Sequence, residues 1–264
     1  YIAFAGGLDS IAPVNTSGNI ESRVKANPTY GQSIVSYAGA SNATGDSSNN
    51  GGSYWTIGHG LSQAPELILV KKRNSTANWY MGHQSLTSTP WQSGSHVVVN
   101  TTAANANEAN ILWGNTAPTS SVFTAGGWDV INRAARTYIA YCFHSVAGYS
   151  KIGSYTGNGS ASAGPAPSTG FPTALLIIKR TNATGNWFIW DNTRDTDGVF
   201  STNIHPNSNA AEANSGSNFV TLSATGFRLT GAGAETNAYG GTYIYIAFAD
   251  KREYAYWLDQ SGNN

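Results

Sequence analysis

Short apolar runs alternate with clusters of glycine, serine and asparagine along the chain. The runs Leu67–Val70 and Leu175–Ile178 are continuous and too short to favour helices. The run Tyr243–Phe248 is apolar on both faces, as expected of a central strand. Turn-forming clusters such as residues 42–53 and 157–170 separate the runs. This pattern predicts an all-β fold of many short strands, as found in sandwiches and barrels.

The same strings of residues occur twice and in the same order, which predicts an internal duplication. Most of the difference in spacing falls in one loop, residues 39–65 in the first copy and 157–172 in the second, and loops tolerate insertions. Each copy has about 110 residues, the size of one β-sandwich. We therefore predict two tandem β-sandwich modules of one topology, at residues 31–148 and 149–264. The pairs expected to superpose are Tyr37 with Tyr155, Lys72 with Lys179, Trp79 with Trp187, and Tyr138 with Tyr245.

Residues 1–30 are predicted to be the closing strand of a preceding module followed by a linker. The segment Tyr1–Ala5 repeats the string that closes each copy, and residues 6–28 then connect it to the first copy. A strand that is apolar on both faces needs a partner. We expect a longer polypeptide with at least one more module before Tyr1; the alternative is donation of this strand to a neighbouring subunit.

Composition excludes several classes of partner. Charged residues are 11% of the chain, against roughly 25% in an average soluble protein, and 14 Lys+Arg balance 14 Asp+Glu. This neutrality offers no electrostatic basis for binding nucleic acid or an anionic membrane. No apolar stretch is long enough to insert into a membrane, and no signal peptide is visible. The single cysteine, Cys142, lies in an apolar run and is interpreted as a small buried hydrophobe.

The repeated strings resemble a module that recurs in tandem in tail-fibre and other structural proteins of marine and cyanobacterial tailed phages. Such modules are labelled as domains of unknown function, and the resemblance implies a lectin-like or jelly-roll sandwich. The family has no known catalytic residues, so the resemblance implies none for this chain. Copy one departs from the pattern, because Tyr80-Met-Gly-His83 stands where copy two has Phe188-Ile-Trp-Asp191. The resemblance covers nearly the whole chain and is carried by residues 27–39, 59–73, 138–159, 186–191 with Arg194, and 243–249.

Asp191, Asp195 and Asp197 form an acidic cluster that could bind Ca²⁺ through carboxylate and loop oxygens. The cluster lacks the downstream glutamate of an EF-hand loop, and Arg194 adds a competing positive charge. We favour the alternative of an Asp–Arg pair that closes a turn, with Gly198 at a special backbone position. No other cofactor is predicted.

Tryptophan supplies the candidate ligand-binding residues. Trp79 and Trp187 repeat at strand starts, which favours core packing. Other tryptophans lack this duplication or lie near polar loops, where exposed aromatics would suit a sugar-binding face or, equally, a subunit interface. These candidates are Trp55, Trp91, Trp113, Trp128 and Trp257.

Enzyme chemistry is not expected. A glycosidase needs two carboxylates across a cleft, and Glu108 and Glu212 instead occupy matching places in the two copies. The histidines lack metal-ligand spacing, and no nucleophile elbow or phosphate-binding loop is present. The basic residues at 71–73 and 179–180 are interpreted as solvated strand ends that block edge pairing.

These observations give three hypotheses of function. The first is a phage virion protein, a tail fibre or similar appendage on the virion surface and hence extracellular. It would act in assembly and attachment, with copies of itself in a trimer, other virion proteins and a host-surface glycan as partners. The second is a secreted carbohydrate-binding module or adhesin of a cellular organism. The third is a tail spike that degrades polysaccharide.

Overall fold

The computed structural model describes residues 12–43, 54–108, 111–214, 216 and 219–250. Within these ranges the protein is all-β, apart from the short 3-10 helix η1 (Pro28–Tyr30) and the single-turn helix α1 (Ala234–Asn237). Neither helix has the length or the apolar character needed to cross a membrane. The chain divides into two compact units, the first comprising Tyr1–Ser145 with Thr181–Asn186 and the second Val146–Arg180 with Trp187–Asn264.

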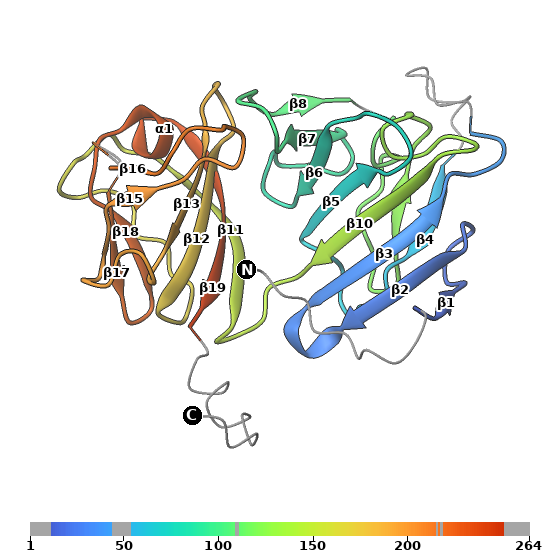
Figure 1. Cartoon of the computed structure of the whole chain (residues 1–264), viewed down its shortest axis with the longest axis horizontal. Helices are drawn as coiled ribbons and strands as arrows, with labels where there is room; N and C mark the ends of the chain where they lie inside the picture. The colour runs from blue at the N-terminus through green and yellow to red at the C-terminus, as the bar shows by residue number, and fades with distance from the viewer. Residues whose placement is uncertain (1–11, 44–53, 109–110, 215, 217–218, 251–264) are drawn as a thin grey trace. The chain divides into compact units, whose positions relative to one another are not determined.

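The first unit is built on an eight-stranded antiparallel sheet (Figure 1). A two-stranded sheet, β4 (Trp55–Gly58) with β9 (Val122–Ala125), forms the second layer. In sheet order, the large sheet contains β1 (Val14–Asn15), β2 (Ser22–Asn27), β3 (Gln32–Ala38), β10 (Thr137–Phe143), β5 (Leu67–Lys72), β6 (Trp79–His83), β7 (Ser95–Val98) and β8 (Ala106–Asn107).

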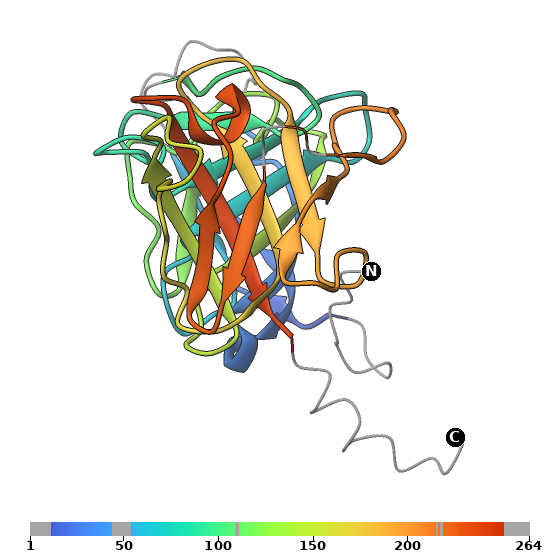
Figure 2. The ribbon, with the colours of Figure 1, turned by 90° about the vertical axis from the view of Figure 1, so that its left-hand side faces the viewer.

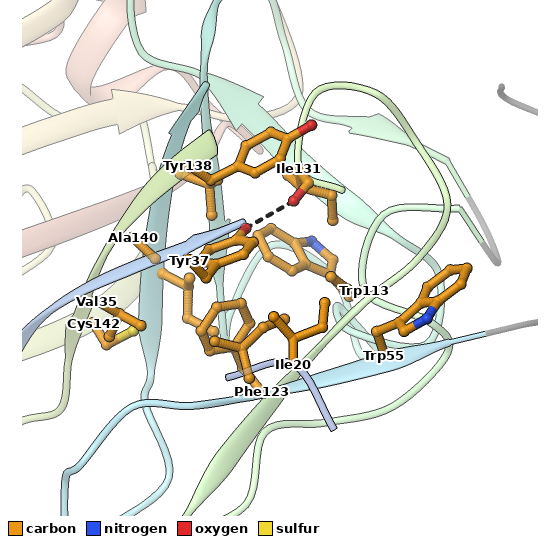
Figure 3. Close-up of a cluster of buried hydrophobic side chains, with 14 of the residues drawn as sticks. Ile20, Val35, Tyr37, Trp55, Trp113, Phe123, Ile131, Tyr138, Ala140 and Cys142 are labelled. Carbon is orange, nitrogen blue, oxygen red and sulfur yellow. Dashed lines mark hydrogen bonds between the residues drawn. The ribbon is translucent and has the colours of Figure 1, made fainter. Parts of the chain in front are cut away.

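The core of the first unit lies between these two layers (Figure 3). Alternate residues of β10, among them Tyr138, Ala140 and Cys142, are fully buried, as the period of a strand requires. Burial raises the pKa of the Cys142 thiol to about 12. The prediction that Cys142 is an inert buried hydrophobe is therefore confirmed, because a thiol of that pKa supplies almost no thiolate.

The second unit has a four-stranded antiparallel sheet and two smaller sheets (Figure 2). Its core includes Leu176, Ile178, Trp190 and Phe227. The large sheet has the order β11 (Ser150–Thr156), β19 (Thr242–Ala249), β12 (Thr173–Arg180) and β13 (Trp187–Asp191). The smaller sheets are β14 (Val199–Phe200), β17 (Val220–Ser223) and β18 (Gly226–Leu229), and β15 (Thr202–Asn203) with β16 (Ala213–Asn214).

Both units share one strand order in their large sheets. The order β3-β10-β5-β6 of the first unit corresponds to β11-β19-β12-β13 of the second, and every neighbouring pair is antiparallel. Trp79 faces Lys71 across the strands, and Trp187 faces Lys179 in the same way. The two tryptophans therefore occupy equivalent positions, and the equivalent of Lys179 is Lys71 rather than the predicted Lys72. The duplication itself remains a prediction about the origin of the chain.

A pair of stacked tyrosines corrects another predicted match. Tyr37 stacks on Tyr138 with ring centroids 5.2 Å apart, and the two are cross-strand partners. In the second unit Tyr155 stacks on its cross-strand partner Tyr243 at 4.9 Å. Tyr138 therefore corresponds to Tyr243, whereas the sequence match paired it with Tyr245. The error arose because Tyr243 and Tyr245 are both buried on the same face of β19.

The predicted linker is also partly wrong. Residues 22–27 form β2, which pairs with β3 along its whole length, and residues 14–15 form β1 at the sheet edge. Val24 is buried against the core and its polar neighbours are not, which is the alternation expected of a strand. The closing-strand prediction for Tyr1–Ala5 falls outside the described residues.

A tight turn closes one end of the first unit. Asn132 is fully buried; its side-chain oxygen accepts from the Ala40 backbone N–H at 2.9 Å, and its Nδ2 donates to the Gly126 carbonyl at 3.1 Å. The turn that follows closes with a hydrogen bond from the Arg136 N–H to the Arg133 carbonyl at 3.1 Å. Ala135 lies inside it at φ 60°, a left-handed conformation that alanine rarely adopts.

The second unit closes with the same turn. Asn237 is fully buried; its oxygen accepts from the Asn158 N–H at 2.9 Å, and its Nδ2 donates to the Gly231 carbonyl at 2.9 Å. The left-handed position is Gly240 at φ 67°. The turn thus has the same hydrogen bonds and backbone in both units, with different side chains on it.

Candidate functional site

One concave site lies on the loop between β13 and β14 in the second unit. It is an open cavity of about 350 Å³. Its lining consists of short polar side chains around one aliphatic residue, namely Asn192, Thr193, Asp195, Thr196, Gly198 and Leu222. Loops held on a rigid sandwich are common places for binding residues.

The loop starts with an Asp–Arg clamp. Asp191 ends β13, and its Oδ1 accepts hydrogen bonds from the backbone N–H groups of Thr193 at 3.1 Å and Arg194 at 3.0 Å, which is an Asx-type turn. Arg194 Nε donates to Asp191 Oδ2 at 2.7 Å, and its Nη1 donates to Glu212 at 2.9 Å. Burial disfavours the charged carboxylate, but the Arg194 contacts outweigh it, so the pKa of Asp191 is lowered.

Asp195 fixes the middle of the loop. Its side chain is buried, and its two oxygens accept four hydrogen bonds at 3.0 Å, from the backbone N–H and the hydroxyl of both Ser201 and Thr202. Asp197 is exposed and accepts from the Val199 N–H at 3.0 Å. Both carboxylates therefore shape the loop through donors of their own chain.

The acidic cluster does not form a metal site in the described residues. No group of three or more His, Cys, Asp or Glu side chains there is placed to hold a metal ion. Asp191 is engaged by Arg194, Asp195 by two hydroxyl residues, and Asp197 by backbone, so the cluster does not fit Ca²⁺. The favoured alternative, an Asp–Arg pair closing a turn with Gly198 at φ 83°, describes this loop correctly.

Three of the candidate tryptophans belong to the core of the first unit rather than to an exposed face. Trp55, Trp91 and Trp113 are 7%, 6% and 1% exposed. The Trp113 indole donates to the Ser95 carbonyl at 3.0 Å, and Trp91 packs edge-on against Trp113 at 5.4 Å. The prediction of a sugar-binding face is wrong for these three, because their polar sequence neighbours lie in turns while the rings point inward.

The remaining two candidates differ. Trp128 is half-buried and packs edge-on against Tyr80 at 5.3 Å, at the margin of the core. Trp257 lies outside the described residues. Of the described tyrosines, Tyr30 is 45% exposed and Tyr239, on the closing turn of the second unit, is 89% exposed.

Of the pocket residues, the sequence singled out Asp195 and Gly198 but not the other four. Asn192, Thr193 and Thr196 are typical turn formers, and the chain has many similar loops. Leu222 contributes from β17, about thirty residues further along. The available signal was the Asp191–Arg194 spacing, which marked a closed turn but gave no indication that a cavity lies beside it.

The pocket lining is rich in hydrogen-bonding groups. Its described residues offer amide and hydroxyl donors and acceptors and a carboxylate, with one aliphatic side chain and no histidine, cysteine or lysine among them. Arg194, beside the pocket, is engaged by two carboxylates. A neutral ligand rich in hydroxyl groups matches this lining, because each hydroxyl both donates and accepts hydrogen bonds.

The basic strand ends differ from their predicted solvated state. Lys179 is fully buried on β12, and Lys72 is buried on β5. Both strands lie inside their sheets, so these residues protect no edge. Burial lowers the pKa of Lys179 to about 8.

Comparison with known proteins places the whole chain in one family. Neither the curated proteins nor the solved structures contain a significant match to it. Residues 1–252 match a family described as "Domain of unknown function (DUF7483)". The match covers nearly all of the chain, and the protein therefore belongs to the DUF7483 family.

Proposed function

We propose that the chain is a structural and adhesive protein of a phage virion, part of a tail fibre or a similar appendage, and that it attaches to a host-surface glycan. The observation that carries the glycan part is the pocket on loop 192–198, a neutral hydrogen-bonding cavity on a rigid β-scaffold. The virion part rests on the resemblance of the repeated strings to phage tail-fibre modules.

Three further features support an adhesive role over an enzymatic one. The pocket lining lacks a nucleophile with a neighbouring base. The carboxylates beside the pocket are held by hydrogen bonds from their own loop. The chain is neutral overall and poor in charged residues, which suits packing against other proteins with little charge desolvation.

Polysaccharide from the host envelope tests the glycan part. Purified protein should bind it, and Thr193→Ala with Thr196→Ala should weaken binding about five- to tenfold through the loss of two hydroxyl contacts. Both threonines are exposed, so the fold should not change. Thr16→Ala with Ser17→Ala, two exposed residues of the first unit, is the matched control and should bind like wild type.

Two outcomes would contradict this proposal. Absence of binding to any envelope polysaccharide would remove the glycan part. Shortening of the polysaccharide during incubation, measured by product sizing, would instead support a degrading tail spike.

Assembly is part of the same proposal. We expect the protein to function as an oligomer with other virion proteins around it, with a trimer as the leading arrangement by analogy with the resembling phage proteins. Parallel copies would increase avidity for a repetitive surface. Light scattering on the purified chain should report a mass near three times 27.8 kDa; a stable monomer at high concentration would count against the trimer.

A further inference from the structure

The closing turn of the first unit carries two arginines that the turn itself does not need. Arg133 and Arg136 form the hydrogen bond that closes this turn through their backbones. The second unit makes the same bond, from the Gly241 N–H to the Ala238 carbonyl at 2.9 Å. Alanine and glycine therefore suffice for the geometry, and the two guanidinium groups call for another explanation.

Both guanidinium groups converge on one carboxylate without being hydrogen-bonded to it. Arg133 Nη1 lies 3.7 Å and Arg136 Nε 3.9 Å from Asp129 Oδ1, which is beyond hydrogen-bonding distance. The partner that does hold Asp129 is Lys72, whose buried Nζ lies 2.5 Å from Oδ2. Three positive groups thus surround one negative group.

The arginine side chains are accessible, and among the described residues no hydrogen bond from either guanidinium group is found. Arg133 is 45% and Arg136 is 35% exposed. Within the part of the chain that the structure describes, Asp129 is the one charged group that either side chain approaches within 4 Å. A guanidinium presents five N–H donors in a planar fork that matches the oxygens of a carboxylate or phosphate.

The second unit shows that the closing turn does not need the charged cluster of Lys72, Asp129, Arg133 and Arg136. Arg180 occupies the register position of Lys72, since Lys72 faces Tyr138 and Arg180 faces Tyr243. Its Nη1 donates to the Ala234 backbone carbonyl at 2.8 Å. The second unit therefore keeps its turn with neither the carboxylate nor the additional arginines.

We propose that Arg133 and Arg136 form an oxyanion site that binds the carboxylate or phosphate groups of an acidic surface polysaccharide. The site rests on the proposed function, since it assigns a ligand class to glycan attachment, and it is separate from the neutral pocket of the second unit. Asp129 is a positioning residue: it draws the two guanidinium groups together, while Lys72 neutralises its charge.

Two anionic polymers and one neutral polymer test this site. Polygalacturonate presents carboxylates, poly(glycerol phosphate) presents phosphates, and dextran is neutral. Wild-type protein should bind at least one of the two anionic polymers, and the polymer that binds more tightly identifies the preferred oxyanion. Binding should weaken when salt is raised from about 50 to about 300 mM, because exposed charges are screened.

The variants compare the two units directly. Arg133→Ala with Arg136→Gly places the second unit's residues on the first unit's turn and should weaken binding to the anionic polymer about tenfold or more. Arg23→Ala with Arg228→Ala removes the same charge from two exposed positions elsewhere and should leave binding near wild type. A urea unfolding curve for each variant establishes that it is folded.

The outcomes separate this inference from the proposed function. Unchanged binding of the anionic polymer by the turn variant, or a wild-type protein that binds neutral but no anionic polymer, overturns the oxyanion site and leaves glycan attachment standing. Equal binding of duplex DNA and of the acidic polymers overturns the assignment to glycan. Failure to bind any polymer or envelope polysaccharide overturns both proposals.

Discussion

The two units of this chain close their sandwiches with the same turn and present different side chains on it. In the first unit the turn carries Arg133 and Arg136, at 45% and 35% exposure. In the second unit it carries Tyr239, at 89% exposure. The backbone around both is fixed by a buried asparagine and by a residue at positive φ.

The two turns therefore share a backbone framework and differ in the side chains that they expose. Residues that hold the turn are alike in the two units, whereas the side chains that face solvent change in charge and in shape. Such a division is typical of loops that carry binding residues on a rigid framework. Four predictions test how far the two scaffolds are equivalent, and they follow from the largest expected effect to the smallest.

The buried asparagines should matter most. Asn132→Ala and Asn237→Ala each remove a hydrogen bond to a part-buried backbone N–H and leave a buried carbonyl without its asparagine donor, so each should cost about 2–4 kcal/mol of unfolding free energy. Urea unfolding followed by tryptophan fluorescence measures the loss. A large cost in one unit and a negligible cost in the other would show that the two turns are held differently.

Lys179, which shares its register position with Lys71, should make the unfolding free energy respond to pH. Burial lowers the pKa of Lys179 to about 8, whereas an unfolded lysine titrates near 10.4. Between those values the unfolded chain retains a proton that folded Lys179 has released, so the contribution of Lys179 to the unfolding free energy should rise with pH. This contribution, measured as wild type minus Lys179→Met, should grow by about 2 kcal/mol from about pH 8 to 10, while the buried Cys142 thiol, whose pKa is raised, acts in the opposite sense in both proteins.

Two substitutions isolate this pH effect. Lys179→Met should remove this contribution, while Lys71→Met, at the same register position of the first unit, is the matched control and should retain it. Urea unfolding at a series of pH values provides the measurement. The same slope in the Lys179 variant as in wild type would assign the effect to another group.

The stacked tyrosines should contribute equally in both units. Tyr37 donates its hydroxyl to the Ile131 carbonyl and Tyr155 donates to the Thr236 carbonyl, both at 2.8 Å (Figure 3 shows the first). Tyr37→Phe and Tyr155→Phe should each cost about 1 kcal/mol. Tyr239→Phe is the control and should have no effect on stability, since Tyr239 is 89% exposed. Costs that differ between Tyr37→Phe and Tyr155→Phe by more than about 1 kcal/mol would argue against one shared framework.

The residue at positive φ should give opposite effects in the two units. Ala135→Gly relieves a left-handed alanine at φ 60° and should stabilise the first unit slightly, whereas Gly240→Ala introduces that strain at φ 67° and should destabilise the second by about 1 kcal/mol. A methyl group at Gly240 would meet no atom within 4 Å, so the effect is conformational. Thermal unfolding of both variants checks the signs, and equal signs would contradict the common turn.

The sequence predicted the apolar strands at the centre of the two large sheets, such as β5, β12 and β19, because their apolar runs are bounded by turn residues. It failed on register, since Tyr243 and Tyr245 are both buried on one face of β19 and the pairing partner Tyr155 alone distinguishes them. It also missed β2, whose residues Ser22–Asn27 are mostly polar and become a strand by pairing with β3.

The binding residues were harder to predict than the fold. Tryptophans near polar loops suggested exposure, yet Trp113 is 1% exposed, and its neighbours Leu112 and Gly114 are buried with it. Thr193 and Thr196 look like turn residues, and the cavity beside them depends on Leu222 from a distant strand. Local sequence determines a turn, whereas a cavity or a charged cluster depends on which segments the fold brings together.

The most direct test of the proposed role is to locate the chain on a particle. Antibody raised against the purified chain should label an outer appendage when tailed phage particles from the source of the sequence are viewed by electron microscopy. Label on a fibre, repeated at each copy of that fibre, is the result that our account predicts. Unlabelled particles, with the protein recovered free in the medium of a cellular organism, would contradict it and support a secreted carbohydrate-binding module instead.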